Sequence, residues 1–295
     1  MKKILAIWQL MRLEHGVMLA LAILVGSLIA GTTFPAVDKF LLTFCTALFL
    51  EASTFALNDY FDYSIDKKNN RTDRPLVRGD ISPRTALLLF AFLFPLGILA
   101  SYFVNLTCFV IAVVTALFAV VYDMVLKKRK LVGNFFIAYI MAIPFVFGGA
   151  AVLPDDMFSV ALPPAILVVA VIAFLAGAGR EIMKDVMDFE GDKIFGVKSF
   201  PAYIGIRASN GVAAMFYIAA VLLSFVPFFV ASFEQYYFNV VYFLPIFITD
   251  TMLLSTSLQL LLKKNVQMKM LRTFTLVALF IGLLGFLVSS FFRWS

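Results

Sequence analysis

The sequence predicts an all-α membrane protein, in which nine transmembrane helices form one bundle around a central cavity. Hydrophobic residues make up 62% of the chain and charged residues 14%, whereas soluble domains average about 45–50% and about 25%. Apolar runs of about 20 residues, the length that crosses a bilayer, recur along all 295 residues. Basic residues gather in alternate connecting segments, as they do in membrane proteins. Because the apolar runs continue towards both ends, we expect a single domain over residues 1–295.

Each apolar run predicts one span. The continuous apolar stretch between residues 86 and 123 is too long for one helix, so we expect it to turn back between Ser101 and Thr107, around Asn105. Ahead of the first span, Ile4 to Leu13 is expected to form a short amphipathic helix at the membrane surface. Two long loops are expected at residues 61–85 and 182–208. The nine predicted spans are 16–34, 40–60, 86–104, 106–123, 132–153, 160–181, 209–232, 238–262 and 273–292.

The positions of the positive charges predict the orientation. With the N-terminus in the cytoplasm, every Lys and Arg except Lys39 and Arg293 falls in a cytoplasmic segment. Lys and Arg are concentrated in the cytoplasmic loops of membrane proteins, so this alternation supports nine crossings of the cell membrane. The net charge of +6 follows from this topology and requires no nucleic-acid partner. Cys45 and Cys108 lie in separate apolar runs and indicate neither a disulfide framework nor a metal site.

An aspartate motif occurs twice, each time where a predicted span reaches the cytoplasmic side. The three aspartates of each copy have the spacing i, i+3, i+7, which places their carboxylates along one face of a helix. Four crossings separate the copies, so both lie on the same side of the membrane and can face one another across the cavity. The six residues are Asp59, Asp62 and Asp66, and Asp185, Asp188 and Asp192.

The two clusters predict a magnesium-dependent diphosphate site. Carboxylates on one helix face repel each other, and a membrane protein keeps such a cluster mainly for a function. Mg²⁺ prefers oxygen ligands and is usually held by a few carboxylates together with substrate phosphates. We therefore expect two Mg²⁺ ions to bridge a diphosphate between the clusters and to stabilise the charge that develops on it as it departs. The alternative, a pair of solvated helix ends, does not explain two copies with matched spacing.

Basic residues near the motifs are candidates for binding this diphosphate. A guanidinium group binds phosphate oxygens in a bidentate manner, and an ammonium group binds them as a point charge. The candidates are Arg71 and Arg74 after the first motif, Lys184 and Lys198 beside the second, and Tyr122 and Lys127 at the end of the fourth span. For the plain basic run Lys128-Arg129-Lys130, we expect only a contribution to topology or to lipid headgroup binding.

Three polar residues near the first two spans are candidates for contacts with an acceptor. Glu51 lies two turns before Asn58 on the second span and is expected to face the same cavity, where it would orient a ligand or accept a proton. Arg12 and His15 precede the first span and would bind an acceptor phosphate at the membrane surface. Each has an ordinary alternative, as a hydrogen-bonded bundle acid or an incidental interfacial side chain. For Asp250 we expect a structural role.

These motifs resemble those of the UbiA superfamily of intramembrane prenyltransferases. The similar segments are Asn58-x₃-Asp62-x₃-Asp66 with Arg71-Thr72-x-Arg74-Pro75-Leu76, then Tyr122 with Lys127, and Asp185-x₂-Asp188-x₃-Asp192. The resemblance covers the whole chain and adds Asn58 to the site. The predicted catalytic residues are then Asn58, Asp62, Asp66, Asp185, Asp188 and Asp192, with Asp59 as a further metal ligand.

The resemblance also implies a reaction. Within the superfamily, the segments Leu131 to Asn134, Arg180 to Asp185 and Gly196 to Pro201 are most similar to the archaeal branch that builds ether lipids. That branch implies Mg²⁺-dependent transfer of a geranylgeranyl group from geranylgeranyl diphosphate to the free hydroxyl of geranylgeranylglyceryl phosphate, forming the second ether bond of archaeal membrane lipids. Two alternatives stay open. One is prenylation of an aromatic acceptor by the same mechanism, and the other is a cation-coupled transporter, which would place acids near the bilayer midplane in broken helices.

Overall fold

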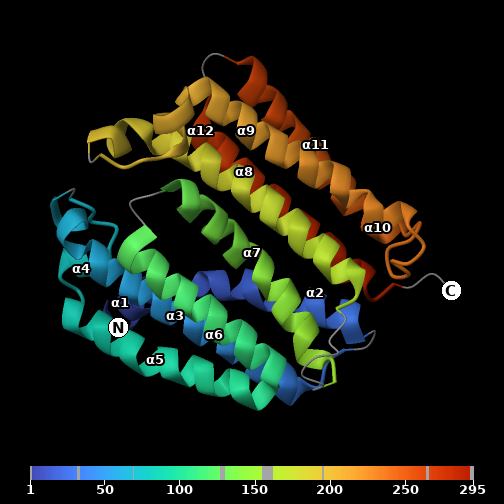
Figure 1. The fold of residues 1–295 in the computed structure, drawn as a ribbon, viewed down its shortest axis with the longest axis horizontal. Helices are drawn as coiled ribbons and strands as arrows, with labels where there is room; N and C mark the ends of the chain where they lie inside the picture. The colour runs from blue at the N-terminus through green and yellow to red at the C-terminus, as the bar shows by residue number, and fades with distance from the viewer. Residues whose placement is uncertain are drawn as a thin grey trace.

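The computed structural model describes residues 2–31, 34–68, 70–126, 130–154, 162–194, 196–263 and 266–292. Over these ranges the chain consists of helices and the turns that join them (Figure 1). In chain order the elements are α1 (Lys2–Met11), η1 (Leu13–His15), α2 (Gly16–Gly31), α3 (Val37–Lys68), α4 (Pro75–Arg78), α5 (Pro83–Val104), α6 (Leu106–Val121), η2 (Tyr122–Leu126), α7 (Lys130–Val152), α8 (Pro164–Ile194), α9 (Phe200–Ser224), α10 (Val226–Phe229), α11 (Val240–Leu262) and α12 (Met268–Ser289).

Within the described ranges, nine helices are long and apolar enough to cross a membrane. They are α2, α3, α5, α6, α7, α8, α9, α11 and α12. This confirms the predicted all-α membrane fold with nine spans. The expected turn around Asn105 is also present, because the Asn105 side chain accepts a hydrogen bond from the Cys108 N–H and donates one to the Ala150 carbonyl of α7. The start of α6 is thereby tied to the end of α7.

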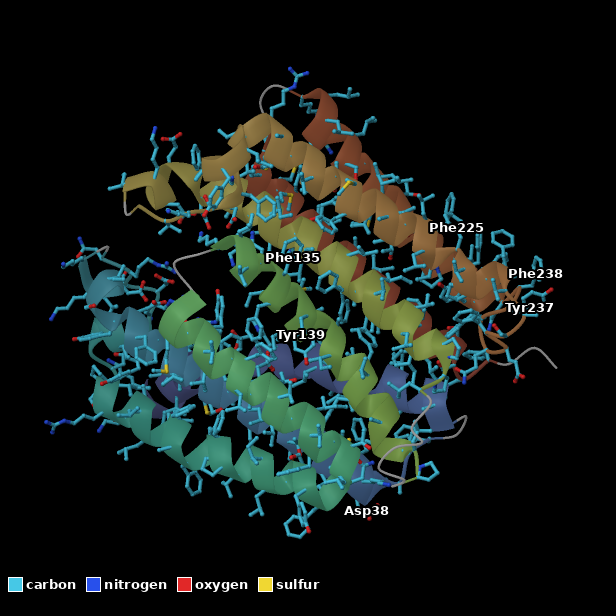
Figure 2. All side chains as sticks on the ribbon, in the orientation of Figure 1. Asp38, Phe135, Tyr139, Phe225, Tyr237 and Phe238 are labelled. Atoms are coloured by element: carbon cyan, nitrogen blue, oxygen red, sulfur yellow. The ribbon has the colours of Figure 1, made fainter. Side chains whose placement is uncertain are left out.

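The helices form two groups that meet along α7. In Figure 1, α3, α5 and α6 lie on one side of the bundle and α8, α9, α11 and α12 on the other, with α7 between α6 and α8. Phe135 of α7 packs against Phe174 of α8, with ring centroids 6.3 Å apart. One turn further along α7, Tyr139 reaches towards α6 and shares a hydrogen bond of 2.8 Å with Thr115 (Figure 2). Helix α7 therefore contacts both groups.

Helices α2 and α7 pack closely because small residues line their contact. A Cβ atom added at Gly26 would overlap the Phe145 carbonyl oxygen, and one added at Gly148 would overlap the Ile23 carbonyl oxygen. The Ser27 hydroxyl donates a hydrogen bond of 2.9 Å to the Gly148 carbonyl. Lipid tails provide no hydrophobic drive between helices, so close backbone packing and interhelical hydrogen bonds hold such pairs together.

Helices α3 and α8 are longer than a bilayer requires. They contain 32 and 31 residues, or about 48 Å and about 46 Å at about 1.5 Å per residue. The hydrocarbon core is about 30 Å thick, so the last turns of both helices extend beyond it, and these turns hold the aspartate motifs. The predicted starts of the two long loops, at residues 61 and 182, are therefore wrong, because hydropathy detects only the part of a helix that lies in lipid. The helices continue to Lys68 and Ile194.

Helix α9 is bent at Gly205. Gly205 has φ 79° and ψ 162°, a conformation that is essentially restricted to glycine. A Cβ atom added there would meet no other atom within 4 Å, so backbone strain is the only penalty of adding one. The bend gives the first turn of α9 a direction different from that of the span that follows.

We expect Gly205→Ala to lower the free energy of unfolding by about 1–3 kcal/mol, the strain of a non-glycine residue in this conformation. Gly211→Ala is the matched control, because it adds a Cβ atom to a straight part of the same helix, also into open space. Alanine has the higher helix propensity, so the control should be neutral or slightly stabilising. Thermal unfolding of both variants in detergent measures the difference, and equal stabilities would contradict the bend.

Candidate active site

An apolar cavity lies among α2, α3, α6 and α7. Its walls are mainly aliphatic and aromatic side chains, and polar residues gather where α3 meets the end of α6. On α3 the lining extends from Thr46 to Asn58, about 18 Å along the helix axis at about 1.5 Å per residue. The polar residues of the lining are Thr46, Glu51, Thr54, Asn58, Thr115, Tyr122 and Asp123.

The first motif begins at the polar end of this cavity. The Asn58 amide donates a hydrogen bond of 2.8 Å to the carboxylate of Asp123, which follows α6 in the π-helical turn η2. Tyr122 stacks on Phe136 of α7, with ring centroids 5.0 Å apart. Single π-helical turns occur often at functional sites. The structure therefore brings together Asn58 and Tyr122, both predicted site residues, and places Asp123 beside them.

Two arginines hold the first aspartate of this motif. The Oδ1 atom of Asp59 accepts hydrogen bonds from Arg12 at 3.1 Å and from Arg74 at 2.7 Å. The Nε atom of Arg74 also lies 3.8 Å from Asp66 Oδ2. Asp59 is 2% exposed and Asp66 is 7% exposed, whereas Asp62 is half-buried. Arg74, a predicted phosphate ligand, thus pairs with acids of the first motif in this structure.

The second motif is held from α7 and α9. Asp185 Oδ2 accepts hydrogen bonds from the Asn134 amide at 2.7 Å and from the Phe200 backbone N–H at 3.2 Å. The Lys130 ammonium group lies 2.6 Å from Asp192 Oδ2 and 3.6 Å from Asp185 Oδ1. The expectation that Lys130 contributes only to topology is therefore wrong. Lys130 is the first residue of α7, and this position directs it to α8 rather than to lipid headgroups.

Arg71 lies in the loop after the first motif and pairs with Asp73 of the same loop. Its guanidinium group donates two hydrogen bonds to Asp73, of 2.9 Å and 2.8 Å. These bonds, with the charges of Asp73, Asp66 and Asp188, outweigh burial and raise the pKa of Arg71. The same hydrogen bonds are the largest cause that lowers the pKa of Asp73, to about 2. The charges of Asp66 of α3 and Asp188 of α8 both favour the charged form of this guanidinium group.

The three predicted acceptor residues are neighbours at the side of the cavity. The Arg12 guanidinium lies 4.1 Å from the ring centroid of Phe55, and the His15 ring meets Phe55 edge-on at 5.5 Å. His15 Nδ1 lies 3.8 Å from a carboxylate oxygen of Glu51, which lines the cavity. Burial, followed by the charge of Arg74, lowers the pKa of Arg12.

The remaining predicted phosphate ligands are placed differently. Lys184 donates a hydrogen bond of 3.1 Å to Glu181 on its own helix. Lys198 is exposed in the segment between α8 and α9, and Lys127 lies outside the described residues.

Asp250, for which a structural role was expected, is buried and accepts a hydrogen bond of 2.7 Å from Ser224. That bond joins α11 to α9.

Sequence reasoning missed Asp123, Lys130 and Asn134 as residues of this site. Lys130 and Asn134 have i, i+4 spacing at the start of α7 and therefore share one helix face. A lysine and an asparagine on one face at a membrane boundary are a signal that would have identified them. Asp123 directly follows the predicted Tyr122, and its acidic side chain at the end of an apolar run is a similar signal.

The donor chemistry of the site fits Mg²⁺. The motifs offer carboxylate oxygens and one amide oxygen, all of them hard ligands. In the described part of the chain, no three His, Cys, Asp or Glu side chains are grouped so that they alone could hold a metal ion. Mg²⁺ commonly takes one or two carboxylates and completes its coordination with water and phosphate oxygens. The arrangement is therefore suited to an ion that binds together with a diphosphate.

A cavity of this kind within a bundle of membrane-length helices, with an acidic motif that begins at its polar end, defines a membrane-embedded enzyme that handles an apolar substrate. The family model described as the UbiA prenyltransferase family matches residues 19–278. The chain therefore belongs to the UbiA prenyltransferase family.

Similar proteins include named sequences and solved structures. The digeranylgeranylglyceryl phosphate synthase of Archaeoglobus fulgidus is 41% identical over 287 residues, which cover 97% of this chain and 95% of the relative. A solved structure that concerns digeranylgeranylglyceryl phosphate synthase in membranes has a TM-score of 0.80 and 31% identity, with coverage of 98% and 99%. A UbiA homologue from Archaeoglobus fulgidus bound to DMAPP and Mg²⁺ has a TM-score of 0.60 and 19% identity, with coverage of 97% for both chains. This last likeness shows the fold alone.

Proposed function

We propose that this protein transfers a geranylgeranyl group from geranylgeranyl diphosphate to the free hydroxyl of geranylgeranylglyceryl phosphate in a Mg²⁺-dependent reaction. The observation that supports the proposal most is the pair of aspartate motifs on helix extensions near an apolar cavity. The name of the Archaeoglobus fulgidus relative supports this pair of substrates. The product would contain the second ether bond of an archaeal membrane lipid.

The donor would bind with its diphosphate at the motifs and its isoprenoid chain in the cavity. Arg74 pairs with the motif acid Asp59, and Arg71 pairs with Asp73 in the loop that follows the motif, and both guanidinium groups would also bind phosphate oxygens. When bound, Mg²⁺ would neutralise charge on the departing diphosphate. We propose two such ions, with Lys127, Lys184 and Lys198 as further phosphate ligands. The apolar lining, about 18 Å long on α3, has a length suited to several isoprene units.

The proposed reaction breaks the bond between the first carbon of the prenyl chain and its bridging oxygen, and the bonding electrons leave with the diphosphate. Positive charge then develops on the allylic carbon, and the ring faces of Tyr122, Phe136 and Phe55 in the cavity lining would stabilise it. The acceptor hydroxyl oxygen forms the new bond to this carbon and loses its proton. Glu51, which also lines the cavity, would accept that proton. The apolar walls exclude water, which would otherwise hydrolyse the donor.

The acceptor phosphate would bind at Arg12 and His15. These side chains lie beside Glu51 at the edge of the cavity, so a phosphate held there leaves the lipid-like part of the acceptor close to the apolar lining. We further propose that the whole chain forms one domain in the cell membrane and that the polar end of the cavity faces the cytoplasm. The concentration of Lys and Arg on that side supports this orientation.

The full-length protein in detergent, incubated with geranylgeranyl diphosphate, Mg²⁺ and geranylgeranylglyceryl phosphate, is expected to form a diether product. Parallel reactions replace the acceptor with 4-hydroxybenzoate or a naphthoate, and mass spectrometry identifies the products. Reactions with EDTA in place of Mg²⁺ serve as the control and should give no product. A prenylated aromatic without the diether would contradict the proposed acceptor, and undiminished activity in EDTA would contradict the proposed metal dependence.

A further inference from the structure

The first aspartate of each motif is the most buried of its three acids. Asp59 and Asp185 are both 2% exposed. The middle aspartates, Asp62 and Asp188, are half-buried, and the side chains of the last aspartates, Asp66 and Asp192, are 10% and 14% exposed. The two copies therefore share not only their spacing but also the way in which each helix presents its acids.

Asp59 joins three segments that are separate in the sequence. Arg12 follows α1, has a left-handed backbone with φ 50°, and donates to the Asp59 carboxylate from the N-terminal segment. Arg74 immediately precedes α4 and donates to the same oxygen atom from the loop that follows the motif. Helix α4, which follows this loop, is held to α1, because its last residue Arg78 donates a hydrogen bond of 2.6 Å to Gln9. Asp59 is thus the point at which α3 holds both the N-terminal segment and this loop.

Asp185 has the corresponding arrangement in the second half of the chain. One of its oxygens accepts the Asn134 amide of α7 and also the backbone N–H of Phe200, the first residue of α9. A carboxylate at a helix N-terminus satisfies an otherwise unpaired N–H and interacts favourably with the helix dipole. The other oxygen faces the Lys130 ammonium at 3.6 Å. Asp185 is thus the point at which α8 holds α7 and α9.

We infer that Asp59 and Asp185 are positioning residues, which fasten the segments around the polar end of the cavity, and that they do not themselves bind the metal. A buried carboxylate is tolerated when hydrogen-bond donors and cations compensate it, and removing one member of such a set leaves the others uncompensated. Asp62 and Asp188 are more exposed and therefore more accessible to an ion that arrives with its substrate. The metal part of this inference rests on the proposed function, whereas the positioning part does not.

The test compares matched alanine variants of the metal-free full-length protein in detergent with EDTA. Asp59→Ala and Asp62→Ala differ by one turn of α3, and Asp185→Ala and Asp188→Ala by one turn of α8. We expect Asp59→Ala and Asp185→Ala to lower Tm by about 5 °C or more, and their partners to change it by less than about 2 °C. Asp62 and Asp188 are half-buried, so water already solvates part of their charge and their removal costs less than that of a buried acid.

Conservative variants and metal binding provide two further readouts. The carbonyl oxygen of asparagine can still accept the Phe200 N–H, so Asp185→Asn should recover more than half of the Tm loss of Asp185→Ala. This variant also covers the case in which Asp185→Ala fails to fold. In titrations with Mn²⁺ followed by electron paramagnetic resonance, Asp59→Asn and Asp185→Asn should bind as many ions as the wild-type protein. Asp62→Asn or Asp188→Asn should bind fewer.

Two results would overturn the inference. One is an unchanged Tm of Asp59→Ala and Asp185→Ala in EDTA together with a loss of bound Mn²⁺, which would make both residues metal ligands. The other is an equal loss of Tm in all four alanine variants, which would make every motif acid structural. If the wild-type protein binds no Mn²⁺, the proposed function fails in its metal dependence. The Tm comparison in EDTA still decides the positioning roles.

Discussion

Replacing Asp188 with alanine is expected to reduce the rate of prenyl transfer by at least about a thousandfold, and Asp62→Ala should have a similar effect. Each residue is the middle acid of its motif and is half-buried. A diphosphate leaves with its full negative charge, so the transition state depends on the cations that these acids hold in place. A thousandfold loss corresponds to about 4 kcal/mol of transition-state stabilisation, which is comparable to the loss of one well-placed electrostatic group.

The matched control is Glu190→Ala. Glu190 is an exposed acid on the same turns of α8, so this variant removes the same charge from the same helix without changing the motif. It should keep at least about half of the wild-type rate at saturating Mg²⁺, because exposed charges contribute little. Initial rates with radiolabelled donor measure all three variants. Full Mg²⁺-dependent activity in Asp62→Ala and Asp188→Ala would exclude the two-motif mechanism.

The number of spans and the shared face of each motif could be predicted because both depend on local properties of the chain. Hydropathy detects every segment that lies in lipid, and Asn105 interrupts the one stretch that needed a turn. The spacing i, i+3, i+7 determines a helix face whatever the rest of the fold does. The ends of α3 and α8 were not predictable in this way, because their last turns are polar and have the same low hydropathy as a loop.

The partners of the motif acids could not be predicted from the same patterns. Asp185 bonds to Asn134 and Asp59 bonds to Arg12, across 51 and 47 positions of the sequence. A spacing within one helix says which side chains share a face, but it does not say which neighbouring helix that face will meet. Lys130 illustrates the limit, since a lysine in a basic run has the same sequence pattern whether it faces headgroups or Asp192.

Gly148→Ala is expected to lower the free energy of unfolding by about 3 kcal/mol or more, the upper part of the range for overpacking. The added Cβ atom would overlap the backbone of Ile23 in α2, and a backbone atom cannot rotate away as a side chain can. Helices α2 and α7 would have to separate, and the hydrogen bond from Ser27 to the Gly148 carbonyl would lengthen. Since both helices line the cavity, the variant should also lose activity at temperatures where it remains folded.

Gly211→Ala again provides the matched control, since it makes the same chemical change in a membrane-length helix where the added atom meets open space. The control should be at least as stable as the wild-type protein, because alanine is favoured over glycine in helices by about 1 kcal/mol. Thermal unfolding in detergent compares the two variants directly. If Gly148→Ala were as stable as Gly211→Ala, the α2–α7 contact would be looser than its small residues imply. The cavity wall would then owe its position to α3 and α6, and Gly148→Ala would keep its activity.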